Sequence, residues 1–162
     1  MRNRIFLKAL LAFIAVIAVA TLTLDFSIRR TWEDSLRSRL QHSLTQHARA
    51  FALRIENDHN HTLQQMADDE AAITEARATI IARDGRVLAD SEADSATMEN
   101  HAQRPEVVSA LKGVPGAATR LSKTVGIEFL YVAVPGGDKI VRLAYPLSSI
   151  RAQIAGIRGS LL

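Results

Sequence analysis

The chain has 162 residues, of which 48% are hydrophobic and 5% aromatic, and it contains no cysteine. This length accommodates one domain with a core of its own and an additional segment. The missing cysteines exclude disulfide bonds, thiol catalysis and cysteine-based zinc sites. The formal net charge is +3, but the sequence contains no compact patch of basic and aromatic residues. We therefore expect no nucleic-acid partner.

The first segment of the chain has the composition of a membrane-spanning helix. The twenty residues from Ile5 to Leu24 include a single charge, Lys8, and basic residues flank them. Twenty helical residues extend for about 30 Å, which is the thickness of the hydrocarbon core of a bilayer. We therefore predict that residues 1–26 form a cytoplasmic tail and a transmembrane helix, with the lipid bilayer as a partner.

A cleaved signal peptide is the alternative interpretation of this segment. The basic start resembles an n-region, and Ala18-Val19-Ala20 resembles an A-x-A cleavage site. Apolar residues continue beyond this site as far as Ile28, without a helix breaker. This continuity favours a retained anchor, whereas cleavage would produce a secreted or periplasmic binding protein.

Residues 27–76, the stalk segment, are predicted to form a long helix, because they contain no glycine and no proline. Apolar residues recur there mostly at spacings of three and four, at Leu36, Leu40, Leu44, Ala48, Phe51, Ile55, Leu63, Met66 and Ile73. A helix of about 45 residues would be about 70 Å long, as in a stalk that packs on a second helix. We predict homodimerisation through residues 36–66, with a polar interruption of the stripe near Asp58.

The five histidines do not have the spacing of a helical metal site. His42 and His47 are five residues apart, and His59 and His61 are two apart. Two imidazoles share a helix face at spacings of three or four residues. We interpret these histidines as solvated, with metal binding or pH sensing by His59 and His61 as the alternative.

After the stalk segment, the sequence pattern changes to that of β-strands. Asp84-Gly85 lies between two apolar runs, which is a strong signal of a β-hairpin. A two-residue type I′ turn at this dipeptide would pair Ala82 with Val87 and Ile81 with Leu88.

The remaining elements are a short helix, three strands and a C-terminal helix. The short helix is predicted from Pro105 to Lys112, because proline suits a first turn and Gly113 suits a helix end. The strands are predicted at residues 117–123, 127–135 and 139–147. In the second of these runs, the residues that would point to either face of the sheet are apolar. We therefore predict that this strand lies in the centre of the sheet. We assign residues 77–147 to a domain with a five-stranded antiparallel sheet, and residues 148–162 to an exit helix leading towards a second span.

This α+β arrangement is similar to that of PAS-like and Cache-like sensor modules. The strings VLADSEADSATMENHAQRPEV, TRLSKTVGIEFLYVAVP and VRLAYPLSSI resemble the extracytoplasmic region of bacterial sensor histidine kinases of the phosphate-regulon (PhoR-type) group. The resemblance covers residues 1–162 and is strongest from Ala78 to Ile150. It implies a periplasmic sensor domain on the inner membrane, followed in the family by a second span, a HAMP linker, a phosphoacceptor helix and an ATP-binding domain.

The chain contains no phosphoacceptor His-Glu pair and no glycine-rich ATP lid. We therefore expect the sensor half alone, or a truncated product, without catalytic residues and without a cofactor. A chemoreceptor or cyclase sensor would share the module and differ in its output domain. An envelope enzyme is a further alternative, but neither a G-x-S-x-G elbow nor an H-E-x-x-H motif supports it. The sequence does not name the stimulus, which is a small ligand or an envelope protein.

Candidate ligand-binding residues lie on the strands and before the short helix. PAS-like domains often hold ligands on one face of the sheet, as the resemblance implies, and an arginine there can bind a carboxylate or phosphate with two hydrogen bonds. The candidates are Arg120, Tyr131, Arg142, Arg104 and His101. Pairing of an arginine with Glu128, or exposure on an outer face, is the alternative interpretation.

The loop after the hairpin is acidic. Its carboxylates are Asp90, Glu92, Asp94 and Glu99, with no basic residue between them. Hard cations bind several oxygen ligands at once, so these four residues are candidates for cation binding or acid sensing. Their spacing lacks the order and the glycine of an EF-hand. The alternative interpretation is that aspartate and serine residues cap turns and helix starts here.

Overall fold

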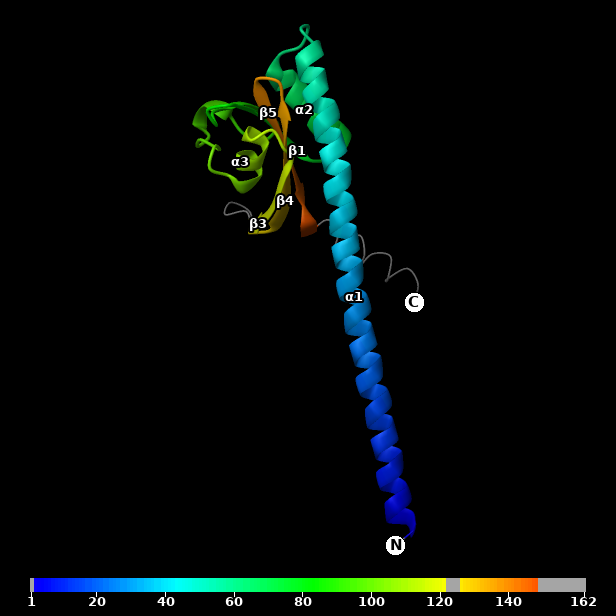
Figure 1. Cartoon of the computed structure of the whole chain (residues 1–162). Helices are drawn as coiled ribbons and strands as arrows, with labels where there is room; N and C mark the ends of the chain where they lie inside the picture. Colours follow the sequence, from blue (N-terminus) through cyan, green and yellow to red (C-terminus); the bar gives the residue numbers. More distant parts are fainter. Residues whose placement is uncertain (1, 122–125, 149–162) are drawn as a thin grey trace. The chain divides into compact units, whose positions relative to one another are not determined.

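The computed structural model describes residues 2–121 and 126–148 (Figure 1). The helices are α1 (Arg2–Asn57), α2 (Leu63–Thr74), the short 3-10 helix η1 (Ser95–Thr97) and α3 (Pro105–Leu111). The strands are β1 (Arg77–Ala82), β2 (Val87–Asp90), β3 (Gly116–Leu121), β4 (Glu128–Gly136) and β5 (Lys139–Pro146). The predicted exit helix lies outside the described residues after Ser148.

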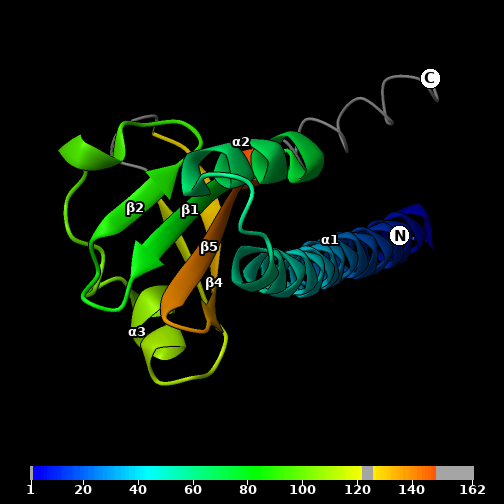
Figure 2. The ribbon, with the colours of Figure 1, turned by 90° about the horizontal axis from the view of Figure 1, so that it is seen from above.

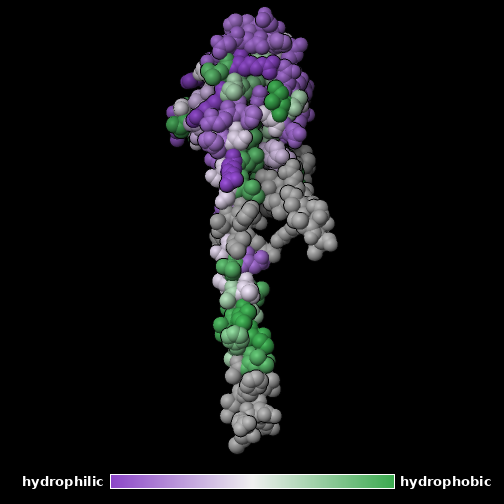
Figure 3. Space-filling model, turned by 90° about the vertical axis from the view of Figure 1, so that its right-hand side faces the viewer, coloured by the Kyte–Doolittle hydropathy of each residue, from purple (hydrophilic) through white to green (hydrophobic). Residues whose placement is uncertain are grey.

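The chain divides into two compact units, Met1–Leu40 and Gln41–Leu162. In the first unit, the window Leu10–Ser27 of α1 has a mean hydropathy of 2.2, and none of it is buried in the protein. Figure 3 shows the hydrophobic side chains that gather on this part of the helix. Among the described residues, this is the one helix long and apolar enough to cross a membrane, a test that an N-terminal signal sequence also passes.

The stalk segment is not a single helix, contrary to the prediction. α1 ends at Asn57 and α2 begins at Leu63. Between them, the Asp58 carboxylate accepts hydrogen bonds from two of the backbone amides that follow it. Thr62 caps α2 through reciprocal hydrogen bonds with Gln65. Such side chains compete with helical backbone hydrogen bonding, so the polar interruption of the stripe ends one helix and starts the next.

The apolar stripe of α1 contributes to the core of its own chain. The buried residues of α1 in the second unit are Leu44, Ala48, Phe51, Ala52 and Ile55. Ala52 packs against the end of β4, where a Cβ added to Gly136 would lie 2.8 Å from the Ala52 Cβ. A dimer contact through Leu44 or Phe51 would require these side chains to leave the core. The homodimer itself stays a prediction.

The strands form one antiparallel sheet in the order β2-β1-β5-β4-β3, which confirms the predicted five-stranded architecture. β5 is the middle strand and pairs with β1 on one side and β4 on the other. β4, which was predicted to be central, is an inner strand between β5 and β3. β4 has apolar residues at both of its alternating sets of positions, and this agrees with the packing of helices on both faces of the sheet.

The β1–β2 hairpin forms at Asp84-Gly85 as predicted, but its register differs. Ile81 lies opposite Val87, next to an irregularity in the ladder. Within this turn only Gly85 has a positive φ, of 88°, whereas a type I′ turn requires positive φ at both central residues. The predicted pairs Ala82–Val87 and Ile81–Leu88 are therefore wrong.

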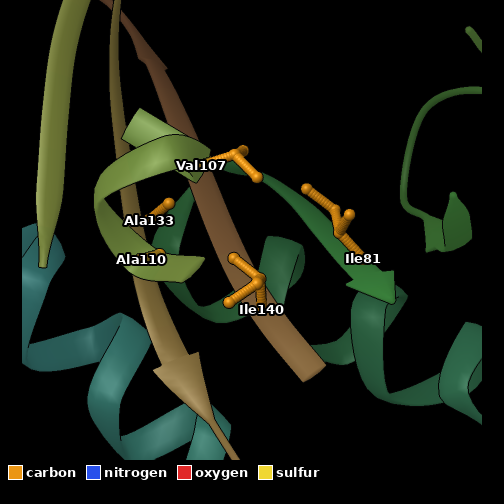
Figure 4. Close-up of a cluster of buried hydrophobic side chains, with 5 residues drawn as sticks. All are labelled: Ile81, Val107, Ala110, Ala133 and Ile140. Carbon is orange, nitrogen blue, oxygen red and sulfur yellow. The ribbon is translucent and has the colours of Figure 1, made fainter. Parts of the chain in front are cut away.

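The two faces of the sheet are covered by different helices. α3 lies on one face, whereas α2 and the second-unit part of α1 lie on the other (Figure 2). On the α3 face, Ile81, Ala133 and Ile140 of three strands pack with Val107 and Ala110 (Figure 4). The neighbouring strand residues on the opposite face are also buried, among them Ile80, Leu130, Val132, Val134, Val141 and Leu143.

α3 begins at Pro105, and Gly113 follows it with a φ of 85°, as predicted from the helix start and stop signals. The helix approaches β3 closely because Gly116 has no side chain. A Cβ at Gly116 would collide with the carbonyl oxygen of Glu106 and would lie 2.7 Å from the Cβ of Ser109. This close approach places the first turn of α3, including Glu106, directly over the sheet.

We expect Phe51→Ala to lower the free energy of unfolding by roughly 3–5 kcal/mol, because it leaves a cavity where α1 meets the sheet. The measurement is urea unfolding of the full chain in detergent micelles, followed by circular dichroism. Ile73→Ala is the control, because Ile73 is 67% exposed on α2 and its truncation costs about 0.5 kcal/mol or less. Equal losses in the two variants would contradict this packing.

Candidate ligand-binding site

One row of residues crosses the α3 face of the sheet from edge to edge. Each residue of the row is paired with the next one across the sheet. From β2 to β3, the row consists of Asp90, Thr79, Arg142, Ala133 and Gly116. Directly paired residues of an antiparallel sheet point to the same face. Because α3 packs on this face, the polar groups of the row are withdrawn from water and need partners within the protein.

Asp90, at one end of this row, has a structural role. Its buried carboxylate accepts hydrogen bonds from the Arg77 Nε at 2.9 and 3.1 Å and from the Thr79 hydroxyl at 2.8 Å. The backbone N–H groups of Glu92 and Ala93 also donate to it, each at 3.0 Å. These bonds occupy both carboxylate oxygens, so Asp90 fixes the end of β2 and the start of the acidic loop.

Arg142 lies on the middle strand and is 4% exposed. Its Nη2 donates to the Thr79 hydroxyl oxygen at 3.0 Å, and that hydroxyl in turn donates to Asp90. Its Nη1 lies 3.9 Å from Oε1 of Glu106, which is beyond hydrogen-bonding distance. Burial lowers the pKa of Arg142 to about 10, against the opposing effect of Glu106, so the guanidinium remains charged at neutral pH.

Glu106 of α3 and Arg120 of β3 form an ion pair over the same face. Nη2 of Arg120 donates to Oε1 of Glu106 at 2.9 Å, and Glu106 is fully buried. The guanidinium carbon of Arg120 lies 4.0 Å from the ring centroid of Tyr131, and that of Arg142 lies 5.5 Å from it. The ring face and the carboxylate together stabilise two arginine charges in a region shielded from water.

His101 lies at the end of the acidic loop, next to these charges. Its backbone N–H donates to the carbonyl of Gly85 at 2.8 Å, and the residue is 5% exposed. Burial, together with the positive charges of Arg142 and Arg104, lowers the pKa of His101 to about 4. The imidazole is therefore neutral at physiological pH, with one donor and one acceptor nitrogen.

Three buried side-chain atoms lack a hydrogen-bond partner within the described residues. They are Nε of Arg142, Oε2 of Glu106 and Nδ1 of His101. An unpaired buried polar group is costly, because it has lost its contacts with water and has gained no replacement. Three such atoms make these side chains a candidate ligand-binding site. We call the cluster of Arg142, Glu106, His101, Arg120 and Tyr131 the arginine site.

The predicted ligand-binding residues belong to this cluster, apart from one. Arg104 is partly exposed, and its Nη2 lies 3.6 Å from Oε2 of Glu99. The alternative interpretation paired an arginine with Glu128. The contact observed for Arg120 is with Glu106. Ligand binding by these residues stays a prediction, because the structure shows their proximity and not an occupant.

The four carboxylates of the acidic loop do not converge on one point. Glu92 lies 3.6 Å from Arg77, and Asp94 accepts a hydrogen bond from the backbone N–H of Ala96 at the start of η1. Asp90 and Glu99 are engaged as described above. The described residues contain no group of three or more histidine, aspartate or glutamate side chains that could hold a metal ion. Asp90 and Asp94 accept backbone hydrogen bonds, as in the capping interpretation, whereas Glu92 and Glu99 lie beside arginines.

Sequence analysis did not identify Glu106 and Thr79 as site residues. An acidic residue in the first turn of a helix is common, because it interacts favourably with the helix dipole, so Glu106 carries no distinctive signal. Threonine is likewise common in strands, so Thr79 resembles an ordinary strand residue. The approach of α3 to Gly116, which brings Glu106 to the arginines, is apparent only in the tertiary structure.

No family model matches the chain, and no curated protein matches its sequence. Among solved structures, the chain is similar to the sensor domain of E. coli DcuS, with 16% identity over 74% of this chain and 97% of that chain, and a TM-score of 0.58. It is also similar to the ligand-binding domain of the Campylobacter jejuni chemoreceptor Tlp3 in complex with 4-methylisoleucine. There the identity is 12% over 74% of this chain and 56% of that chain, with a TM-score of 0.57.

The sensor domain of the V. cholerae histidine kinase DctB is a further match, with 21% identity over 68% of this chain and 48% of that chain, and a TM-score of 0.49. The chain therefore spans about half the length of the DctB and Tlp3 structures. At such identities the similarity concerns the fold. The predicted PAS-like or Cache-like sensor fold is confirmed by the match to DcuS, which extends over nearly all of that domain.

We expect the folded chain to lose stability as the pH falls from about 6.5 towards about 4, because of His101. In the unfolded chain this imidazole binds a proton near pH 6.5, whereas in the folded chain it stays neutral until about pH 4. Protonation therefore favours the unfolded state within this window. Urea unfolding at pH 7.5, 5.5 and 4.5 measures the loss, which should be smaller in His101→Gln. The same pH dependence in both proteins would contradict the expectation.

Proposed function

We propose that the chain is the extracytoplasmic sensing part of a bacterial signal-transduction protein, anchored in the inner membrane by the N-terminal part of α1. The arginine site is the observation that supports this function. A buried arginine on the middle strand is a costly way to stabilise a sheet, since an apolar side chain of similar volume often serves as well or better. Its position beside unpaired donors and acceptors favours a role in binding.

A sensor histidine kinase of the PhoR-type group is the proposed complete protein. The resemblance of residues 78–150 to that group supports this assignment, and DcuS is another sensor domain with the same fold. A chemoreceptor is the second candidate, because the ligand-binding domain of Tlp3 also shares the fold. The two candidates differ in the output domain that is linked to the sensor.

The charges of the arginine site favour a small ligand with an anionic group. Arg77 is paired with Asp90, and Arg120 is paired with Glu106. Within the described residues, Arg142 has no carboxylate at hydrogen-bonding distance, although its neighbour Glu106 is 3.9 Å away. A guanidinium in this state binds a carboxylate through charge-assisted hydrogen bonds, which are about twice as strong as neutral ones.

A homodimer through α1 is part of the proposal. The face of the helix that includes Leu53 is open for such a contact, because Leu53 is 60% exposed, whereas Phe51 is part of the core. A second helix at this face would provide the partner against which α1 shifts. A differential interaction of a few kcal/mol is sufficient to shift an equilibrium between two packing states.

We expect an alkaline phosphatase fused after Ser148 to be active in E. coli cells, because this enzyme folds correctly only outside the cytoplasm. The measurement is phosphatase activity in whole cells, with the fusion recovered from the membrane fraction. A green fluorescent protein fused at the same residue is the matched control and should be dark. Fluorescent and phosphatase-inactive fusions would contradict the proposed orientation, and a fusion recovered in the soluble periplasm would contradict the anchor.

We expect Arg142→Gln to weaken the binding of the sensor's ligand at least tenfold, because hydrogen bonds to a charged group contribute about 1.5–3 kcal/mol each. Isothermal titration calorimetry of the full chain in detergent micelles, against organic acids, phosphate and amino acids, measures the affinity. Arg86→Gln is the control, because the Arg86 side chain is 72% exposed in the hairpin turn.

Arg120→Gln provides a second variant, since the Arg120 side chain is 24% exposed and glutamine keeps an N–H donor. Circular dichroism establishes that each variant is folded before titration. The proposed function is contradicted if no compound of the panel binds the unmodified chain, or if both variants bind as tightly as the unmodified chain does.

A further inference from the structure

We propose that Glu70 makes the packing of α2 against α1 sensitive to pH, so that its protonation tightens this contact and loss of the proton weakens it. Glu70 belongs to α2, which covers the opposite face of the sheet from the arginine site (Figure 2). The device therefore requires no ligand other than the proton, and it gives α1 a second input that is independent of Arg142.

Glu70 lies on the face of α2 that packs into the protein. The buried residues of this helix are Met66, Ala67 and Glu70, which share one helix face by their spacing. Glu70 is 7% exposed, although glutamate is almost never buried unless it is paired. A carboxyl group thus occupies a position at which the helix otherwise has apolar side chains.

The Glu70 carboxylate has no hydrogen bond and no close ion pair within the described residues. The positively charged groups that influence it are His47 and Arg54, both on α1. Nη2 of Arg54 donates to Oδ2 of Asp69 at 2.7 Å, and its Nε lies 3.8 Å from Oδ2 of Asp58. The guanidinium is therefore already engaged with two other carboxylates, and it compensates Glu70 only in part.

The strands beneath α2 add no charge to this contact. α2 packs on β1 and β2, whose side chains on that face include Ala78, Ile80 and Ala89, all fully buried. The charged residues of the two strands, Arg77 and Asp90, alternate onto the opposite face, where they pair with one another. Among the described residues, the charge of Glu70 is thus balanced from α1 alone.

Burial raises the pKa of Glu70 above its ordinary value of 4.5, against the opposing effects of His47 and Arg54. The charged form is disfavoured while α2 is packed, and it is accommodated when α2 moves away and water reaches the carboxylate. The contact therefore has its full stability below pH 4.5, and it loses stability as the pH rises through the raised pKa of the packed state.

His47 acts against this effect. Histidine gains its positive charge at mildly acidic pH, and a positive charge beside Glu70 favours the carboxylate over the neutral acid. We therefore expect His47→Gln to move the tightening of the contact to higher pH. Because His47 is exposed on α1, this replacement leaves the core intact.

The test is hydrogen exchange of the full chain in detergent micelles at pH 7.5, 6.0 and 4.5, followed by mass spectrometry. Glu70→Gln retains the size of the side chain and removes its charge. At pH 7.5 we expect the amides of α2 to exchange more slowly in this variant than in the unmodified chain, by about twofold or more, and we expect the ratio to approach one at pH 4.5. Comparison at one pH cancels the intrinsic pH dependence of exchange and the contribution of His101.

Asp68→Asn is the matched control. It removes one negative charge from an exposed position of the same helix, and asparagine keeps the oxygen that accepts a hydrogen bond from Gln64. We expect α2 to exchange in this variant as it does in the unmodified chain at each pH. A gain equal to that of Glu70→Gln would assign the effect to the net charge of the helix and would overturn the role of Glu70.

A second measurement follows the contact itself. The chain has no cysteine, so spin labels can be attached at Arg49→Cys on α1 and Ala72→Cys on α2, which are both exposed positions. The labelled chain is diluted with unlabelled chain, and double electron–electron resonance measures the distances. We expect a narrower distance distribution at pH 5 than at pH 7.5, and the narrow distribution at both values when Glu70→Gln is added.

Three further outcomes would overturn the inference. They are faster exchange of α2 in Glu70→Gln at pH 7.5, a ratio of exchange rates that is the same at every pH, and distance distributions that do not respond to pH. A Glu70→Gln variant that fails to fold at pH 7.5 would also overturn it, since removal of the charge is expected to stabilise the contact. Ligand binding by Arg142 tests the proposed function separately, because Glu70 has no part in that site.

Discussion

The burial of one positive charge in the middle of the sheet governs the arrangement of this domain. Removing a guanidinium from water costs several kcal/mol unless other groups replace the lost hydration. For Arg142 the replacing groups are the hydroxyl of Thr79, the ring face of Tyr131 and the carboxylate of Glu106. They come from β1, β4 and α3, so these three elements have to be in place together for the charge to be tolerated.

Features that depend on local chemistry could be predicted from the sequence. Pro105 and Gly113 bound α3, and Asp84-Gly85 forms the hairpin turn, because these residues restrict or extend the accessible backbone dihedral angles wherever they occur. The strands followed from the spacing of their apolar residues. Arg120 and Arg142 were identifiable as site candidates, because a charged residue within an apolar strand run requires a partner or a function.

Features that depend on contacts between residues far apart in the sequence, or on side-chain hydrogen bonds, could not be predicted. Glu106 and Arg120 are 14 residues apart, and nothing in either local sequence indicates their contact. The hairpin register depends on the dihedral angles of the turn, since Asp-Gly is compatible with more than one turn type. The end of α1 depends on Asp58 and Thr62, whose side chains are tolerated within a helix but here form hydrogen bonds that begin α2.

The alternation of side chains along a strand connects the arginine site to the helices on the other face of the sheet. Arg142 lies between Val141 and Leu143, which are fully buried on that opposite face. Any displacement of the Arg142 backbone therefore displaces two side chains of a close-packed layer, which responds by discrete shifts rather than by compression. Pairing one buried charged group contributes about 1.5–3 kcal/mol, and a few kcal/mol suffice to shift a two-state equilibrium. Under the proposed function, a contact between a ligand and Arg142 would therefore be strong enough to alter how the sheet packs on its helices.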